Sequence, residues 1–229
     1  MKKNLYFSKF MSSISKNISL KTADILFEIK AIYANIKKPF KLTSGRLSPV
    51  YIDCRKIISF HKQRKKIIDL AIKIIRKEIN ISSLDYVAGG ETAGIPFASW
   101  IADGLSLPML YVRKKPKGFG RMSQIEGDMP KGSRVLLIED LATDGKSKVM
   151  FCKTLRKAGA KINHAFVIFH YGIFKEGEGK LKKEKIKLHS LSNWHDAISV
   201  AKKKNYFNDK AIFEIERFLT NPQSWKIKK

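Results

Sequence analysis

Two adjacent acids follow a strongly apolar run near the middle of the chain. Residues 135–138 are Val-Leu-Leu-Ile, and Glu139 and Asp140 come directly after them. A fully apolar run of this length predicts a strand buried on both faces, and the carboxyl end of such a strand borders the crevice where parallel sheets bind ligands. Carboxylates in that crevice can accept hydrogen bonds from neighbouring hydroxyls of a sugar.

A loop with the composition of a phosphate site follows the acid pair. Its residues are small, polar or charged: Ala142, Thr143, Asp144, Gly145, Lys146 and Ser147. The loop leads into a predicted helix over 146–158, so its N–H groups and hydroxyls can bind a phosphate at the positive end of that helix. Acids beside such a loop favour a sugar phosphate. The alternative is that Asp140 and Asp144 only form a turn and a helix cap.

A cationic segment, residues 113–121, contains five cations and two glycines and has no apolar run that could pack in a core. We expect a mobile lid there, whose natural complement is a polyanion such as pyrophosphate. The alternative is a solvated basic loop.

A glycine-rich turn, residues 88–92, joins a predicted strand to a predicted helix. It reads Ala-Gly-Gly-Glu-Thr, and glycine lets the backbone approach a ligand closely. A pair of glycines is a weak signal alone, but this turn would share the carboxyl edge of the sheet with the acid pair. We therefore add Glu91 and Thr92 to the candidates for phosphate binding.

A parallel sheet would bring these segments to one edge. Predicted strands over 86–88, 109–112, 135–138 and 165–169 alternate with predicted helices over 61–79, 93–104 and 146–158. The alternation predicts an α/β fold with a parallel sheet. Residues 40–58, which have turn chemistry between short apolar pieces, predict a hairpin-like insertion ahead of it.

Both ends of the chain are expected to lie outside this alternation. Residues 1–21 contain no acid and several serines, and are interpreted as a loose N-terminal segment. Apolar residues at helical spacing from Thr22, a plausible N-cap, predict a helix that runs to Ile36. A charged stretch that contains glycine, residues 172–187, precedes predicted helices over 194–204 and 209–219. The proposed division of the chain is a loose N-terminal segment over 1–21, a main domain over 22–190 and a helical extension over 191–229. The extension is expected to pack on the main domain.

The composition excludes several classes of protein. The formal charge is +26, but 37 lysines are spread along the chain beside 28 isoleucines, which is typical of A/T-rich coding bias. Nucleic-acid binders usually concentrate arginine and aromatic residues on one element, so we expect no dedicated nucleic-acid partner. No uncharged run approaches the ~20 residues of a membrane-spanning helix. Cys54 and Cys152 signal neither a disulfide scaffold nor a zinc site, which favours a reducing, cytoplasmic location.

Residues 135–147 resemble the phosphoribosyl pyrophosphate (PRPP) signature of the type I phosphoribosyltransferases. Residues 40–59 are similar to the entry motif of the orotate phosphoribosyltransferases, and the glycine-rich turn, cationic loop and acid-pair loop follow in that family's order. The resemblance covers roughly residues 25–170. It implies the parallel-sheet type I phosphoribosyltransferase fold with an N-terminal hood and a C-terminal helical extension.

The resemblance also implies an activity and its partners. Orotate and PRPP would give orotidine 5′-monophosphate and pyrophosphate in pyrimidine biosynthesis. Mg²⁺ would be held mainly through PRPP, with Glu139 and Asp140 nearby. The family's lids typically reach into the neighbouring subunit's site, which implies a homodimer with shared active sites.

Roles carried over from the family follow its motifs. Lys117, Arg113 and Asp140 would be catalytic, Lys114 would contact pyrophosphate, and Glu139 with Asp140 would hold the ribose hydroxyls. The loop from Ala142 to Ser147, with Glu91 and Thr92, would bind the phosphates. The orotate contacts would be Lys41, Ser44, Gly45, Arg46, Tyr51, Thr143 and His170.

Two departures from the family pattern concern the orotate site. Thr43 stands where the family often has a lysine, and Lys41, on the same strand face, is the candidate to replace it. His170 follows the last predicted strand, where many relatives carry an arginine. The remaining alternatives are another nucleobase phosphoribosyltransferase, or a non-catalytic regulator that senses PRPP.

Overall fold

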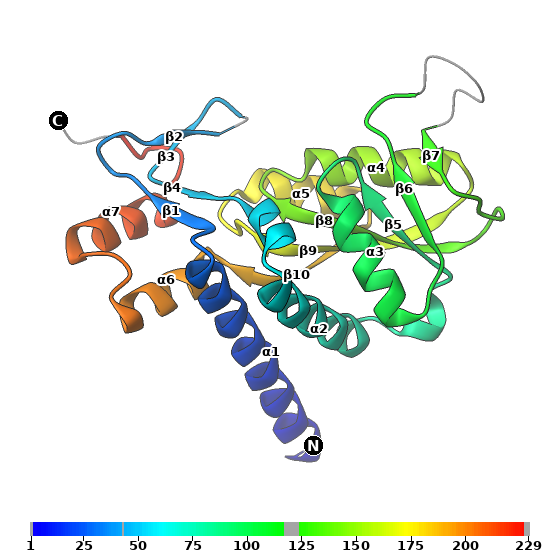
Figure 1. Ribbon diagram of the computed structural model, residues 1–229, viewed down its shortest axis with the longest axis horizontal. Helices are drawn as coiled ribbons and strands as arrows, with labels where there is room; N and C mark the ends of the chain where they lie inside the picture. Colours follow the sequence, from blue (N-terminus) through cyan, green and yellow to red (C-terminus); the bar gives the residue numbers. More distant parts are fainter. Residues whose placement is uncertain (1, 43, 117–123, 227–229) are drawn as a thin grey trace.

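The computed structural model describes residues 2–42, 44–116 and 124–226, with side chains from residue 15 onward. Its centre is a six-stranded sheet in the order β10-β9-β8-β5-β6-β7 (Figure 1). The strands are β5 (Tyr86–Gly90), β6 (Met109–Val112), β7 (Ile125–Glu126), β8 (Arg134–Ala142), β9 (Lys161–His170) and β10 (Lys187–Asn193). Neighbouring strands are parallel, except that β7 is antiparallel to β6. The predicted α/β fold with a parallel sheet is confirmed.

Helices cover both faces of the sheet (Figure 1). On one face lie α1 (Lys2–Glu28), α2 (His61–Glu78) and α3 (Gly94–Leu105), and on the other lie α4 (Lys146–Lys157) and α5 (Lys175–Lys183). Side chains of β8 alternate between the two layers. Leu136 and Ile138 belong to the first core cluster and Leu137 to the second. The predicted burial of this strand on both faces is therefore confirmed.

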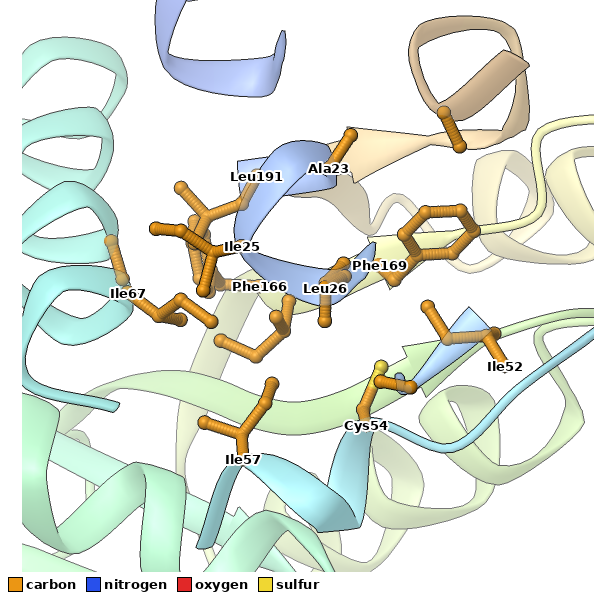
Figure 2. Packing of buried hydrophobic residues seen from close by; sticks show 14 of the residues in the cluster. Ala23, Ile25, Leu26, Ile52, Cys54, Ile57, Ile67, Phe166, Phe169 and Leu191 are labelled. Atoms are coloured by element: carbon orange, nitrogen blue, oxygen red, sulfur yellow. The ribbon is translucent and has the colours of Figure 1, made fainter. Parts of the chain in front are cut away.

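The first core cluster joins the N-terminal helix to the sheet. Figure 2 shows Ile25 and Leu26 of α1 among Phe166 of β9, Leu191 of β10 and Ile67 of α2. The same cluster includes Phe218 of α7 (Asp209–Thr220), so the C-terminal helices and the sheet share one core.

Most of the predicted elements are confirmed, with shifted bounds. The helices predicted over 61–79, 93–104 and 146–158 are α2, α3 and α4, and those predicted near the C-terminus are α6 (Trp194–Lys204) and α7. The predicted insertion is also present. Its strands β2 (Phe40–Lys41) and β3 (Leu47–Ser48) pair as a hairpin, and β4 (Val50–Ile52) leads into the 3₁₀ helix η1 (Cys54–Ser59). Within the described residues, no helix has both the length and the apolar character needed to cross a bilayer.

The prediction of a loose N-terminal segment is wrong. α1 begins at Lys2, and Ile18, Ser19 and Thr22 are buried in it. Thr22 is not a helix cap, because its hydroxyl donates to the backbone oxygen of Ile18 one turn earlier. Where side chains are described, the burial of Ile18 and Ser19, which a single sequence does not reveal, outweighs the poor amphipathic pattern of the segment.

The helix predicted to run from Thr22 to Ile36 is also wrong beyond Glu28. The chain turns at Lys30, and β1 (Ile32–Ala34) pairs antiparallel with β4. Ile32 lies opposite Ile52 in this pair, and both side chains are buried. The apolar residues after Glu28 thus serve a strand, because a long-range partner was available to pair with them.

Two elements were missed between residues 172 and 193. Residues 175–183 form α5, and Lys187–Asn193 form β10, which pairs in parallel with β9. The proposed boundary at residues 190 and 191 therefore falls inside a strand of the central sheet. Short polar strands such as this one lack the apolar run that reveals a buried strand, and pairing with β9 decides their conformation.

A buried carboxylate fastens α1 to the start of α6. Asp196 accepts hydrogen bonds from the Ser19 hydroxyl and the Lys16 ammonium, both on α1. It also accepts from the side-chain amide of Asn193 at 3.0 Å, and Asn193 in turn caps α6. Asp196 is only 4% exposed, so these donors replace the water that its charge would otherwise require.

We expect Asp196→Ala to lower the free energy of unfolding by about 2 kcal/mol, because the buried Ser19 hydroxyl loses its acceptor and the exposed Lys16 ammonium loses its partner. The matched control is Asp24→Ala, which removes an exposed pair between α1 and Lys204 at 2.6 Å. That change is expected to cost ~0.5 kcal/mol. Urea unfolding monitored by circular dichroism measures the free energy of unfolding of both variants. Equal losses in the two variants would show that the buried Asp196 does not stabilise the attachment of α1 more than an exposed ion pair does.

Candidate active site

The carboxyl ends of β5, β6, β8 and β9 bring most of the predicted site residues to one edge of the sheet. Ala142 lies opposite His170 where β8 and β9 end, and Ile138 lies opposite Gly89 on β5. The acid pair, the loop after it and the glycine-rich turn are therefore neighbours, as the parallel arrangement predicted.

The hairpin formed by β2 and β3, here called the hood hairpin, lies against the predicted phosphate loop. A pocket of about 190 Å³ is lined by Ser44 and Arg46 from the hairpin and by Thr143, Asp144 and Lys146 from the loop. Its remaining walls are Leu42, Phe174, Glu176 and Lys180. The structure thus places two segments about a hundred residues apart around one space of the size of a small polar ligand.

Arg46 is held in this pocket by contacts with the start of α5. Its guanidinium lies 4.8 Å from the ring centroid of Phe174 and 4.0 Å from the Glu176 carboxylate. Glu176 also accepts a hydrogen bond from Gln223 at 2.7 Å, and these neighbours together with its backbone hold the pKa of Glu176 below its ordinary value. A planar cation is therefore oriented beside an aromatic ring in the lining of the pocket.

The loop after the acid pair has the shape of a helix start. Gly145 has a φ of +70° at the N-cap of α4, a conformation that favours glycine. Asp144 accepts a hydrogen bond from the Lys146 backbone N–H at 3.2 Å, so its carboxylate serves the turn. For Asp144 the structure thus supports the alternative interpretation from the sequence. The N–H groups of the loop still lie at the positive end of α4.

The side chains of the two adjacent acids, Glu139 and Asp140, point to opposite faces of β8, because side chains alternate along a strand. Glu139 is on the α4 side, 7% exposed, and its Oε2 atom lies 2.6 Å from the Lys148 ammonium. The same oxygen accepts from the Ser147 hydroxyl at 3.0 Å. The prediction treated both acids as one pair facing the crevice, but the structure commits this oxygen of Glu139 to the protein itself.

Asp140 remains the acid with a carboxylate available to a ligand. Burial raises its pKa above the ordinary value, Lys148 opposes that rise, and the neighbouring charge of Glu139 adds to it. Asp140 also contributes to raising the pKa of the Cys54 thiol, so this carboxylate lies on the η1 side of the sheet. It is half-buried and can still accept hydrogen bonds from a sugar.

The glycine-rich turn meets the start of the cationic segment. The backbone N–H of Lys114 donates to the Glu91 carboxylate at 2.6 Å, and the Glu91 N–H donates to the Val112 oxygen at 2.9 Å. Arg113 lies 3.8 Å from the Glu126 carboxylate on β7. Arg113 and Lys114 are thus placed beside the turn, while Lys117, like Thr43, lies outside the described residues.

Four predicted orotate residues, Lys41, Gly45, Tyr51 and His170, do not line the pocket. Lys41 is exposed on β2, and Tyr51 packs with Phe40 at a ring-centroid distance of 5.5 Å. His170 is half-buried at the end of β9, where burial lowers its pKa and favours the neutral ring. Gly45 belongs to the hairpin turn, and its N–H donates to the Leu42 oxygen at 2.8 Å.

The sequence prediction missed Lys148 and the pocket wall from α5. Lys148 lies one residue after the motif over 135–147, and nothing in its type or position distinguishes it from the other lysines of the chain. The available signal was that a buried Glu139 needs a cation close by. The spacing of Glu176 and Lys180, four residues apart, was the available signal for α5. No comparable sequence signal shows that α5 would pack against the hood.

Gly94 allows α3 to touch the strand that carries the acids. A Cβ atom at this position would lie 2.5 Å from the Ile138 oxygen and 3.2 Å from the Glu139 Cα, both backbone atoms. We expect Gly94→Ala to weaken PRPP binding by about tenfold, because the glycine-rich turn and the acid strand must separate.

Isothermal titration with PRPP measures this effect. The control is Gly179→Ala on α5, where no atom lies within 4 Å of the added Cβ. It is expected to leave binding unchanged. Wild-type PRPP affinity in Gly94→Ala would show that this contact is not needed for the site.

Comparisons with known proteins agree with this geometry. Residues 57–203 match the model of the phosphoribosyl transferase domain. The chain is 49% identical to orotate phosphoribosyltransferase of Rhizobium rhizogenes over 203 residues, which cover 89% of this chain and 88% of the relative. It is also 49% identical to the Dinoroseobacter shibae protein of the same name, with 90% and 91% covered.

Solved structures show the same relationship. Orotate phosphoribosyltransferase from Aeropyrum pernix superposes with a TM-score of 0.68 and 32% identity, covering 81% of this chain and 99% of that one. Leishmania donovani UMP synthase gives a TM-score of 0.75 and 25% identity, and the match covers 88% of this chain but only 42% of that longer one. With the matched domain, the high identity and the hood-covered pocket in view, the chain belongs to the orotate phosphoribosyltransferase family.

Proposed function

We propose that this protein transfers the phosphoribosyl group of PRPP to orotate, releasing pyrophosphate and orotidine 5′-monophosphate for pyrimidine synthesis. The observation that carries the proposal is the pocket in which Ser44 and Arg46 of the hood face the Thr143–Lys146 loop. The pocket lies between the Arg46 cation and the start of α4, which supports binding of an anionic base beside a phosphate. The curated relatives at 49% identity carry the name of this activity.

The chain contributes positions and charges to this reaction. The bond from the ribose anomeric carbon to pyrophosphate breaks, and a bond from that carbon to an orotate nitrogen forms. In the proposal, Asp140 accepts hydrogen bonds from the ribose hydroxyls and the loop from Thr143 to Ser147 holds the 5′-phosphate. Arg113 and Lys114 offset the charge of the departing pyrophosphate. No protein nucleophile is required.

Mg²⁺ fits the residues as a metal carried by the substrate. Among the described residues, no three histidine, cysteine, aspartate or glutamate side chains gather as metal ligands. Mg²⁺ is commonly held by substrate phosphates with one or two carboxylates, and Asp140 is the carboxylate that the proposal assigns, with Glu139 next to it. When bound, the metal would supply positive charge to the pyrophosphate.

Recognition of orotate is assigned to Arg46. Orotate is planar and carries a carboxylate, and Arg46 presents a planar cation stacked near Phe174. Lys180 lines the same pocket and adds to its positive charge. These cations would take the place of the family's usual orotate-contacting arginine, whereas a neutral His170 offers no charge to a carboxylate.

A second candidate is transfer to a different base. An adenine phosphoribosyltransferase structure superposes with a TM-score of 0.58 at 22% identity, so the fold alone does not select the base. The hood hairpin and Arg46 favour an anionic base over adenine. A regulator that only senses PRPP would keep the phosphate loop but show no turnover.

We expect the purified protein to consume orotate in the presence of PRPP and Mg²⁺. The loss of orotate absorbance measures this reaction. Uracil, hypoxanthine and adenine serve as control bases and should give no product. Excess chelator should abolish turnover, because the lid cations alone cannot offset the charge of pyrophosphate in water. Turnover of a control base would refute orotate specificity, and full activity in chelator would refute the metal requirement.

The proposal includes a cytoplasmic location and a homodimer in which the two subunits share their active sites. The location rests on two buried, unpaired thiols, Cys54 and Cys152, which suit a reducing compartment. The dimer rests on the family resemblance, in which the lid of one subunit serves the site of the other. Lys117 is the lid residue that tests this arrangement.

We expect Lys117→Ala and Asp140→Asn homodimers each to be nearly inactive, and a mixture of the two to recover activity. In a mixed dimer one site receives the intact lysine from one chain and the intact acid from the other. Statistical exchange then restores roughly a quarter of wild-type sites. Mass spectrometry confirms the exchange, and exchange without recovered activity would show that each lid serves its own subunit.

A further inference from the structure

Lys148 is a buried cation with three acceptors around it. Its side chain is 5% exposed, and its ammonium lies 2.6 Å from Glu139 Oε2. It also donates to the Ser147 hydroxyl at 3.1 Å and to the backbone oxygen of Leu141. An ammonium has three protons to donate, so the site satisfies it fully.

These three acceptors belong to both ends of the predicted phosphate loop. Glu139 and Leu141 lie near the carboxyl end of strand β8, and Ser147 lies at the start of helix α4. Lys148 itself is on α4, so its contacts tie the strand and the helix together across the loop. The shape of residues 142–147 therefore depends on a cation that no ligand needs to touch.

The charge of Lys148 also reaches the acid on the other face of β8. Besides burial, the groups that influence the pKa of Asp140 include Lys148, which lowers it, and Glu139, which raises it. From η1, Cys54 and Arg55 face the same carboxylate. Lys148 therefore contributes positive charge to both acids of β8.

We propose that Lys148 is a positioning residue for PRPP, which sets the shape of the phosphate loop and the orientation of Glu139 from behind. The inference rests on the proposed function, since it assigns PRPP to this loop. It separates two lysines of the same segment. Lys146 is 71% exposed and can face a ligand, whereas Lys148 is enclosed and acts through its neighbours.

The first test is Lys148→Met, which keeps the length of the side chain and removes its charge. We expect the dissociation constant for PRPP, measured by calorimetry without any base, to rise about tenfold or more. We also expect the KM for PRPP to rise in parallel, because the loop that is proposed to bind PRPP loses the cation that fixes its shape. The KM for orotate should change much less.

The control is Lys153→Met on the same helix. Lys153 is exposed and pairs with Glu184 at 2.9 Å, away from the loop. This variant should keep wild-type PRPP affinity and the wild-type KM for PRPP. PRPP binding does not depend on which base is transferred, so a failure of the orotate proposal would be seen separately, in the base specificity.

A second variant covers the case in which Lys148→Met fails to fold. Glu139→Gln/Lys148→Met removes both buried charges and is expected to recover thermal stability, as neutral replacements of buried pairs often do. Its PRPP affinity should stay low, because the Leu141 oxygen and the Ser147 hydroxyl have lost their donor. Recovery of both stability and PRPP affinity would overturn the proposal, and so would wild-type PRPP affinity in Lys148→Met.

Discussion

The burial of β8 on both faces is the constraint on which the rest of the structure depends. Its side chains alternate between two core clusters, and its neighbours β5 and β9 occupy both of its edges. Polar groups at its carboxyl end cannot all be hydrated, so each needs a local partner. The Lys148 ammonium meets that need for Glu139, and the position of α4 follows from the contact.

Packing of the helices on this strand then sets the spacing of the site. α3 can approach because Gly94 leaves room at Ile138, and α4 begins at Gly145 in a conformation that suits glycine. α5 brings Phe174 and Glu176 against Arg46 of the hood. The pocket thus arises where three segments meet, namely the β2–β3 hairpin, the loop before α4 and the start of α5.

The parts of the site that could be predicted are those in which local chemistry and topology agree. The apolar run before Glu139 and the loop to Ser147 predicted a strand, a turn and a helix start, and parallel pairing brought the glycine-rich turn beside them. The predictions failed where a distant partner decided the outcome. The last residues before Thr22 are helical and partly buried, with Ile18 in the core that α1 shares with the sheet, and residues after Glu28 pair with β4 because their apolar side chains are covered there.

The sequence by itself determined the parallel sheet, the order of its candidate loops and the family resemblance, because periodicity and turn residues act over a few positions. Only the tertiary structure decided which lysine is buried, which face each acid takes and what encloses the pocket. Lys146 and Lys148 are chemically identical in the sequence, and burial beside Glu139 distinguishes them. Such differences arise from desolvation and from contacts between segments far apart, neither of which a local pattern encodes.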